Sequence, residues 1–198
     1  LNPDEVNIVP RAWDVLHGGG LDPGWYDYPS LLMLVLAPTQ ALADAPSYGA
    51  ARVAAVALGV AGVAATWWLG SRAYGRRAAL IGALGVAVAT THVAYSRMAV
   101  TDVLLTLGCT AALALLVEGR LEWAGAVAGL AASAKYPGAI LVVPLVVAGW
   151  GAWGRLGRAI GLAAAAFLVT SPFVVLHAGA ALDDVRRVQE LARLGWLG

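Results

Sequence analysis

The sequence has little charge for its length. Only 13% of its 198 residues are Asp, Glu, Lys or Arg, whereas a soluble domain carries about 25%. The one cysteine, Cys109, excludes an internal disulfide and a multi-thiolate metal site. A phosphate-binding Walker loop, a dinucleotide glycine pattern, an HExxH zinc motif and a serine nucleophile elbow are all missing. The formal net charge of +1 gives no electrostatic reason to expect a nucleic-acid partner.

Apolar residues are abundant instead: 60% of the chain is hydrophobic and the mean hydropathy is +0.74. Apolar runs follow one another along almost the whole chain, which predicts an all-α, polytopic helical membrane protein. A membrane span needs roughly 20 apolar residues, so the shorter of these runs would be marginal crossings. We expect about six transmembrane helices, in the runs 48–69, 78–94, 103–117, 123–134, 139–153 and 159–176.

The run at residues 30–42 contains Pro38 and is too short to cross, so it is predicted to be a re-entrant or juxtamembrane helix. A short surface helix is expected at residues 7–16. The expected organisation is an outer loop at 1–29, a short juxtamembrane helix at 30–44, a transmembrane bundle at 48–176 and an outer amphipathic segment at 177–198. The chain starts at Leu1 rather than Met and stops after the amphipathic segment, so we expect the N-terminal part of a transmembrane domain with both ends truncated.

Arginines mark one side of the predicted membrane. The loops 70–77, 118–122 and 154–158 hold six arginines and two acids, and the other acids all fall on the opposite side. Because short cytoplasmic loops are enriched in arginine and lysine, the six-arginine side is predicted to be cytoplasmic. Arg97 and Asp102, which lie between two apolar runs, then reach the outer boundary together with Lys135. We therefore expect the functional groups on the extracytoplasmic face of a bacterial inner membrane.

Each charged candidate on this face has a structural and a functional interpretation. The adjacent Asp4 and Glu5 are either solvated loop acids or a general base and a ligand for a hard metal ion. Asp102 either caps an apolar helix or takes part in chemistry. Arg97 and Lys135 either extend to the membrane interface or bind a phosphate group.

An aromatic cluster precedes the short apolar run. Trp25, Tyr26 and Tyr28 surround Asp27 in the sequence WYDYP. Aromatic side chains concentrate at membrane interfaces, and aromatics beside an acid also suit a sugar ring. Both interpretations stay open from the residues alone.

Four short motifs occur in a defined order along the chain. They are the acidic pair Asp4-Glu5, the segment YDYPSLLMLVLAP, the segment SRMAVTD at 96–102, and GLAASAKY at 129–136. In this order they resemble the membrane glycosyltransferases of the type C fold. The nearest branch is that of the protein O-mannosyltransferases and the bacterial aminoarabinose transferases that act on lipid A. The resemblance covers nearly the whole chain.

The resemblance implies an enzyme that moves a mannose-like sugar from a polyprenyl-phosphate carrier to a protein or glycolipid acceptor, with inversion, at the outer face. It implies that Asp4 acts as base on the acceptor or positions it, with Glu5 beside it. Asp102 matches the second acid, which in some members shares a divalent metal with the first. The carrier's phosphate would contact Arg97 and Lys135. The site for the sugar or the acceptor would be lined by Trp25, Tyr26 and Tyr28.

The sequence departs from the family pattern in the aromatic loop. That motif often has two prolines, with a preceding lysine in the aminoarabinose branch, whereas Tyr28-Pro29-Ser30 has one proline and no lysine. Two other functions stay open: a transporter or permease, which also needs intramembrane charge and broken helices, and a polymerase or ligase of lipid-linked glycans. Acids gathered at one face and the lack of a clear internal repeat favour the enzyme over the transporter.

Overall fold

The computed structural model describes residues 2–195, and these form helices and connecting loops with no β-strand. The expectation of an all-α fold is confirmed for this part of the chain. The helices in chain order are α1 (Pro3–Asp14), α2 (Leu31–Gln40), α3 (Tyr48–Ala73), α4 (Arg76–Val88), α5 (Thr90–Ser96), α6 (Thr101–Val117), α7 (Leu121–Ala134), the 3₁₀ helix η1 (Tyr136–Leu141), α8 (Val142–Ala148), α9 (Trp153–Thr170), α10 (Pro172–Leu176) and α11 (Ala178–Arg193). Residue 1 and residues 196–198, at the ends of the expected outer loop and amphipathic segment, lie outside the described residues.

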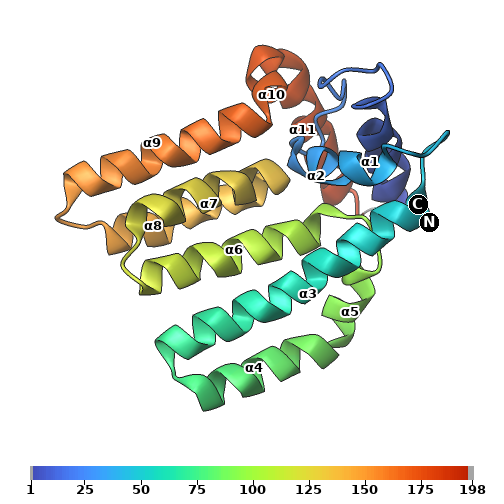
Figure 1. Ribbon diagram of the computed structural model, residues 1–198. Helices are drawn as coiled ribbons and strands as arrows, with labels where there is room; N and C mark the ends of the chain where they lie inside the picture. The colour runs from blue at the N-terminus through green and yellow to red at the C-terminus, as the bar shows by residue number, and fades with distance from the viewer. Residues whose placement is uncertain (1, 196–198) are drawn as a thin grey trace.

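The apolar helices α3, α4, α6, α7 and α9 lie side by side, whereas α1, α2, α10 and α11 gather at one end of this bundle (Figure 1). The neighbouring pairs in the bundle are α4 with α3, α3 with α6, α6 with α7 and α7 with α9. The helix ends and turns that hold the predicted cytoplasmic arginines lie at the far end from the gathered helices (Figure 1). The bundle therefore has two chemically different ends, as the charge pattern predicts.

Glycines allow α7 to pack closely on α9. A Cβ atom at Gly125 would collide with the backbone of Ala159, and one at Gly129 with the backbone of Ala163. The two glycines are four residues apart, so they lie on one face of α7 opposite an equally spaced alanine pair. Small-xxx-small spacing of this kind brings helix backbones into contact in apolar surroundings.

Helix α1 is longer at its N-terminus than the short helix expected at 7–16. Asn2 caps it by accepting a hydrogen bond from the Asp4 amide at 2.9 Å, and the Glu5 side chain accepts one from the Asn2 amide at 3.1 Å. This is a capping box with proline at the first helical position, a strong start signal. Of the expected outer loop, residues 3–14 are helical and only the later residues form a loop, and α1 packs its buried Ile8 and Val9 into a core shared with α2.

Three predicted spans are interrupted, one of them, residues 159–176, at Ser171 between α9 and α10. Residues 78–94 form α4 and α5 instead of one helix, with a bend of 61° at extended Ala89. Residues 139–153 contain η1 and α8, whose combined apolar stretch ends in a turn at residues 149–152. The following helix α9 begins at Trp153 instead of residue 159, so the turn comes earlier than the apolar pattern indicates.

Helix length and apolarity single out α3 as able to cross a membrane, or two spans if the bent α4–α5 pair is taken as one. Shorter apolar helices occupy Leu31–Gln40, Thr101–Val117 and Tyr136–Ala148. The predicted short helix at residues 30–42 is thus present as α2. Six crossings stay a prediction.

Candidate functional site

Two acids that are far apart in the sequence are linked through Tyr28 and Lys135 at the same end of the bundle. The Tyr28 hydroxyl donates a hydrogen bond to Asp4 Oδ2 at 3.1 Å. Lys135 Nζ lies 5.3 Å from the centre of the Tyr28 ring and donates to Asp102 Oδ1 at 2.8 Å. Asp4 of α1, Tyr28 of the following loop, Lys135 at the end of α7 and Asp102 at the start of α6 thus form one connected group, which we call the Asp4–Asp102 site.

The pKa of Tyr28 is shifted by its surroundings in this site. Burial raises the pKa of Tyr28, and the nearby carboxylates of Asp4 and Asp102 raise it further. A tyrosine that stays protonated is a hydrogen-bond donor to Asp4 across the physiological range. Tyr28 therefore holds Asp4 in place without competing with it for protons.

The other two predicted aromatic residues, Trp25 and Tyr26, lie in the same loop as Tyr28 and have different contacts. Trp25 packs edge-on against Tyr28 with ring centres 5.6 Å apart, and the Arg11 guanidinium lies 5.0 Å above the Trp25 ring. Tyr26 is buried, and its hydroxyl contacts Asp22 and His177 Nδ1, each at 2.7 Å. Burial, with Asp22 beside the hydroxyl, raises the pKa of Tyr26 to about 12. Tyr28 thus belongs to the Asp4–Asp102 site with Trp25 packed against it, whereas Tyr26 fixes the loop.

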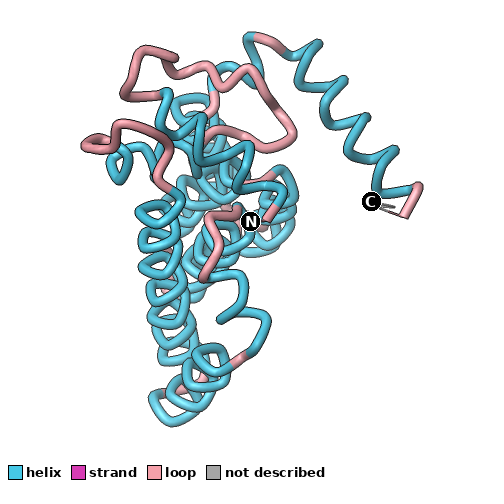
Figure 2. Tube along the Cα trace, turned by 90° about the vertical axis from the view of Figure 1, so that its right-hand side faces the viewer, coloured by secondary structure: helices cyan, strands magenta, loops and turns pink. Residues whose placement is uncertain are grey.

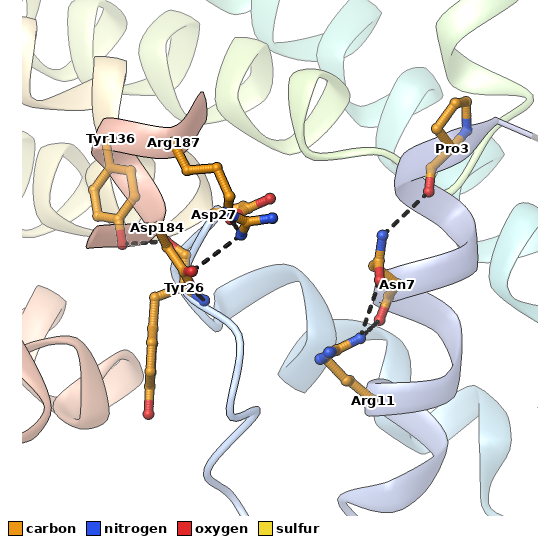
Figure 3. A network of polar contacts seen from close by, with 8 residues as sticks. All are labelled: Pro3, Asn7, Arg11, Tyr26, Asp27, Tyr136, Asp184 and Arg187. Atoms are coloured by element: carbon orange, nitrogen blue, oxygen red, sulfur yellow. Dashed lines mark hydrogen bonds and ion pairs between the residues drawn. The ribbon is translucent and has the colours of Figure 1, made fainter. Parts of the chain in front are cut away.

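The loop is also held from the C-terminal side (Figure 3). The Tyr26 amide donates to Asp184 Oδ2 at 2.9 Å, and the Tyr136 hydroxyl donates to the Tyr26 carbonyl at 2.8 Å. Arg187 donates to Asp27 at 2.6 Å and to Asp184 at 3.0 Å. Residues of η1 and α11 therefore tie down the segment that carries Tyr28.

A buried hydroxyl cluster lies beneath the site. Ser133 Oγ and Ser171 Oγ are 2.6 Å apart, the Thr170 hydroxyl donates to Ser133 at 2.7 Å, and the Ser30 amide donates to Ser171 at 2.9 Å. Ser30 lies two residues after Tyr28, and Ser133 two residues before Lys135. The cluster therefore joins the ends of α7 and α9 to the start of α2, just below the two residues that link the acids.

Glu5 has a different environment from Asp4. Its side chain is fully buried and accepts hydrogen bonds from Arg52 Nε at 2.9 Å, Arg52 Nη2 at 2.7 Å and the Ala99 amide at 2.9 Å. The Arg52 side chain lowers the pKa of Glu5 to about 2. All these contacts fix Glu5 as the tie between α1, α3 and the loop before α6. A catalytic role for Glu5 stays a prediction, and its contacts show a positioning role.

Arg52 was not among the candidates from the sequence. It lies close to the N-terminus of the apolar helix α3, where a single arginine is easily taken for the charged edge of a hydrophobic run. The signal that could have found it is the cost of an unpaired charge in such a helix, which demands an acidic partner elsewhere in the chain.

Arg97 lies at the C-terminal end of α5 and is exposed. Among residues 2–195 its side chain has no ion pair or hydrogen bond, and it lines a hollow with Arg52 and Met98. The structure therefore pairs Lys135 directly with Asp102 and places Arg97 beside Arg52. A second hollow of about 470 Å³ lies next to Asp102, with Thr106, His92 and Tyr95 in its wall.

Whether a divalent metal fits between Asp4 and Asp102 depends on the side chains that could coordinate it. Within the described chain no three His, Cys, Asp or Glu side chains gather as metal ligands. The ammonium group of Lys135 takes the position beside Asp102 that a cation would need. The predicted metal shared by Asp4 and Asp102 would have to displace it, so this geometry favours lysine as the charge partner.

The opposite end of the bundle carries structural ion pairs. Glu118 accepts hydrogen bonds or ion pairs from Trp68 and Arg72, and Glu122 from Arg155 and Arg158. Both acids are therefore neutralised between the bundle helices at that end. No group there resembles the Asp4–Asp102 site.

In an apolar helical bundle, carboxylates and a lysine gathered at one end mark a candidate functional site of a membrane protein. The family model of glycosyltransferase family 87 matches residues 25–189, which is most of the chain. The protein therefore belongs to glycosyltransferase family 87, whose members are membrane proteins. No curated protein and no solved structure matches it.

The matched region includes Tyr28, Arg97, Asp102 and Lys135 and leaves α1, with Asp4 and Glu5, before its start. The expected membrane glycosyltransferase family is thus confirmed at this level. The match does not decide the O-mannosyltransferase or aminoarabinose branch.

Proposed function

We propose that this protein transfers a sugar from a polyprenyl-phosphate carrier to a hydroxyl group of a protein or glycolipid acceptor, at the extracytoplasmic face of a bacterial inner membrane. The observation that carries the proposal is the link from Asp4 through Tyr28 and Lys135 to Asp102. It unites a carboxylate and a cation at one end of an apolar bundle, which is what a phosphate leaving group and a nucleophilic hydroxyl require.

In the proposed reaction Asp4 accepts the proton of the acceptor hydroxyl while the acceptor oxygen forms a bond to the anomeric carbon. The bond between that carbon and the carrier's phosphate oxygen breaks, and the electron pair leaves with the phosphate. Lys135 stabilises the negative charge that develops there, and Arg97 is the second cation at this face. A single displacement inverts the configuration of the sugar.

In this scheme Asp102 orients Lys135, the cation that stabilises the leaving phosphate. Its ion pair with Lys135 holds the ammonium group close to Tyr28, so that phosphate binding needs little rearrangement. Trp25 and Tyr28 offer aromatic edges to the sugar ring. A divalent metal held by Asp4 and Asp102 would supply the same charge stabilisation, and no step here depends on it.

The polyprenyl-phosphate carrier, the mannose-like sugar, the acceptor and the inversion are taken from the resemblance. A polymerase or ligase of lipid-linked glycans would use the same donor chemistry with a glycan as acceptor. The family match favours any of these transferases over a permease.

The test compares Asp4→Asn with Asp44→Asn, a change to an exposed acid at the same end of the fold. Transfer of labelled sugar from a polyprenyl-phosphate donor is measured in proteoliposomes that contain the longest available form of the protein. We expect Asp4→Asn to lower kcat by about 10²–10⁴-fold, because general-base catalysis contributes that much. Equal rates for both variants would exclude Asp4 as the base.

A further inference from the structure

A hollow between α5 and α6 opens beside the Asp4–Asp102 site. It has a volume of about 470 Å³, within the size range of small-molecule sites. Its wall is formed by the end of α4, the break at Ala89, α5 and the first two turns of α6. Asp102 lies in this wall, whereas neither Trp25 nor Tyr28 does. The hollow is therefore separate from the aromatic loop and adjoins the Asp4–Asp102 site at its second acid.

Asp102 has one carboxylate oxygen to spare for a ligand in this hollow. Its Oδ1 accepts the hydrogen bond from Lys135 at 2.8 Å, and its Oδ2 has no hydrogen-bond partner within residues 2–195. The side chain is 38% exposed. An ionised carboxylate accepts hydrogen bonds at both oxygens, so Oδ2 can bind a hydroxyl group while Oδ1 keeps its ion pair.

Three further wall residues carry free hydrogen-bonding groups. Tyr95 is exposed, and its hydroxyl has no partner in the described part of the chain. His92 Nε2 donates to the Gly59 carbonyl at 3.1 Å, which leaves Nδ1 as an acceptor in the neutral ring. The Thr106 hydroxyl donates to the Asp102 carbonyl at 2.8 Å and keeps its capacity to accept. Together these groups can bind several hydroxyl groups of one ligand.

The composition of the wall selects a neutral ligand with many hydroxyl groups. The wall contains a carboxylate and no lysine or arginine, so it disfavours a phosphate or another anion. Apolar surface from Val86, Val103 and the ring of Tyr95 lies among the polar groups. A pyranose ring has hydroxyl groups at its edge and C–H groups on its faces, so it matches both kinds of surface. The groove of about 360 Å³ between α7, α8 and α9 offers only the hydroxyl of Tyr136 and is otherwise apolar.

We propose that the hollow beside Asp102 binds a neutral pyranose ring, with Asp102 Oδ2, His92, Tyr95 and Thr106 hydrogen-bonded to its hydroxyl groups. The proposal rests on the proposed function, in which a sugar is transferred, and adds a place for a sugar ring next to the ion pair of Asp102 with Lys135. Two molecules supply this chemistry: the sugar of the donor and a sugar of a glycan acceptor.

The first test measures binding of methyl α-D-mannopyranoside, and separately of methyl α-D-glucopyranoside, to the protein in nanodiscs by saturation-transfer NMR. Thr106→Val removes one hydroxyl. Thr110→Val is its matched control, because Thr110 also bonds back along α6 at 2.8 Å and lies outside the wall. Tyr95→Phe is compared with Tyr74→Phe, a change at an exposed tyrosine of the far end. We expect Thr106→Val and Tyr95→Phe each to weaken binding about three- to tenfold, the effect of one lost hydrogen bond, and both controls to match the wild type.

Filling the hollow gives a second test that does not depend on single hydrogen bonds. Val86→Trp places an indole in the wall, and Val88→Trp is its control, because Val88 is an exposed valine of the same helix outside the wall. We expect Val86→Trp to abolish saturation transfer to the glycoside and Val88→Trp to leave it unchanged. Binding that stays unchanged in Val86→Trp, or wild-type protein that binds neither glycoside, would overturn the proposal.

The transfer assay identifies the source of the sugar ring. If Thr106→Val and Tyr95→Phe raise the KM of the polyprenyl-phosphate donor alone, the hollow holds the donor sugar, and if they raise the KM of the acceptor alone, it holds the acceptor glycan. Transfer with both KM values unchanged would refute the hollow and leave the proposed function intact. Wild-type protein that binds the glycoside in the hollow and transfers no sugar would refute the proposed function and not the hollow.

Discussion

At the scale of single residues, neighbours in the sequence have opposite environments. Asp4 is partly exposed with one hydrogen bond from Tyr28, whereas Glu5 is fully buried with four hydrogen bonds from Asn2, Arg52 and Ala99. The sequence could indicate that an acidic pair stands at the start of the chain. It could not separate the two acids, because their difference depends on Arg52 and on the loop before α6, which only the fold brings near.

Glu5 is expected to make the stability of the fold depend on pH. Its pKa falls from 4.5 to about 2 on folding, so the ionised form stabilises the folded state at any pH above 4.5. This contribution, roughly 3 kcal/mol, is lost as the pH falls from 4.5 towards 2. Chemical unfolding in detergent at a series of pH values measures it, and in Glu5→Gln the acid-dependent step should be missing. A Glu5→Gln profile that overlays the wild-type profile would contradict this assignment.

The Tyr28 hydroxyl should matter for activity and little for stability. Tyr28→Phe keeps the ring beside Lys135 and removes the hydrogen bond to Asp4. We expect kcat to fall about tenfold, since one positioning hydrogen bond is lost. Tyr74→Phe, a change at an exposed tyrosine at the far end, serves as control. The melting temperature of both variants should match the wild type, and a large drop for Tyr28→Phe would indicate a structural role instead.

At the scale of helices, the apolar pattern predicts the existence of most elements and misplaces several ends. The short helix α2 and the apolar helices α3, α6 and α7 lie where the pattern puts them. No proline or glycine lies at the break at Ala89, so the local sequence does not predict the bend. It follows from tertiary packing, because α5 is held on α3 through His92 and Ser96.

The contact of α7 with α9 should tolerate no added side chain. Gly125→Ala and Gly129→Ala place a Cβ against the backbone of α9, and we expect each to lower the unfolding free energy by about 1–3 kcal/mol. Gly161→Ala is the matched control on α9, where a Cβ meets open space, and its effect should stay within about 1 kcal/mol. Reversible unfolding in mixed micelles measures all three. Equal stability of the three variants would show that the helices can separate without cost.

At the scale of the whole molecule, the site is assembled from helix ends. Asp4, Lys135 and Asp102 each lie at or beside the terminus of a helix, and Tyr28, at the end of the loop at 22–28, contacts Asp4 and lies beside Lys135. Seen from the side, α11 extends away from the bundle towards the C-terminus (Figure 2). Its contacts with the rest of the fold run through Asp184 and Arg187 to the loop.

Arg187 is expected to control the order of this loop. Arg187→Ala removes the ion pair with Asp27, whereas Arg186→Ala removes only the contact with Asp183 inside α11. We expect faster hydrogen exchange at residues 22–28 and a several-fold lower kcat in Arg187→Ala. Arg186→Ala should match the wild type in both readouts. Identical exchange in the two variants would mean that α11 does not hold the loop.

The turn between α8 and α9 lies at the far end of the bundle from α1 (Figure 1). Gly151 there has a φ of 81° with open space around it, and no residue of the turn takes part in the Asp4–Asp102 site. Surface turns of this kind accept inserted sequence. A fluorescent or enzymatic reporter placed after Gly151 can therefore reveal which compartment this end faces in a cell whose enzyme still works, so that topology and turnover are read from the same molecule.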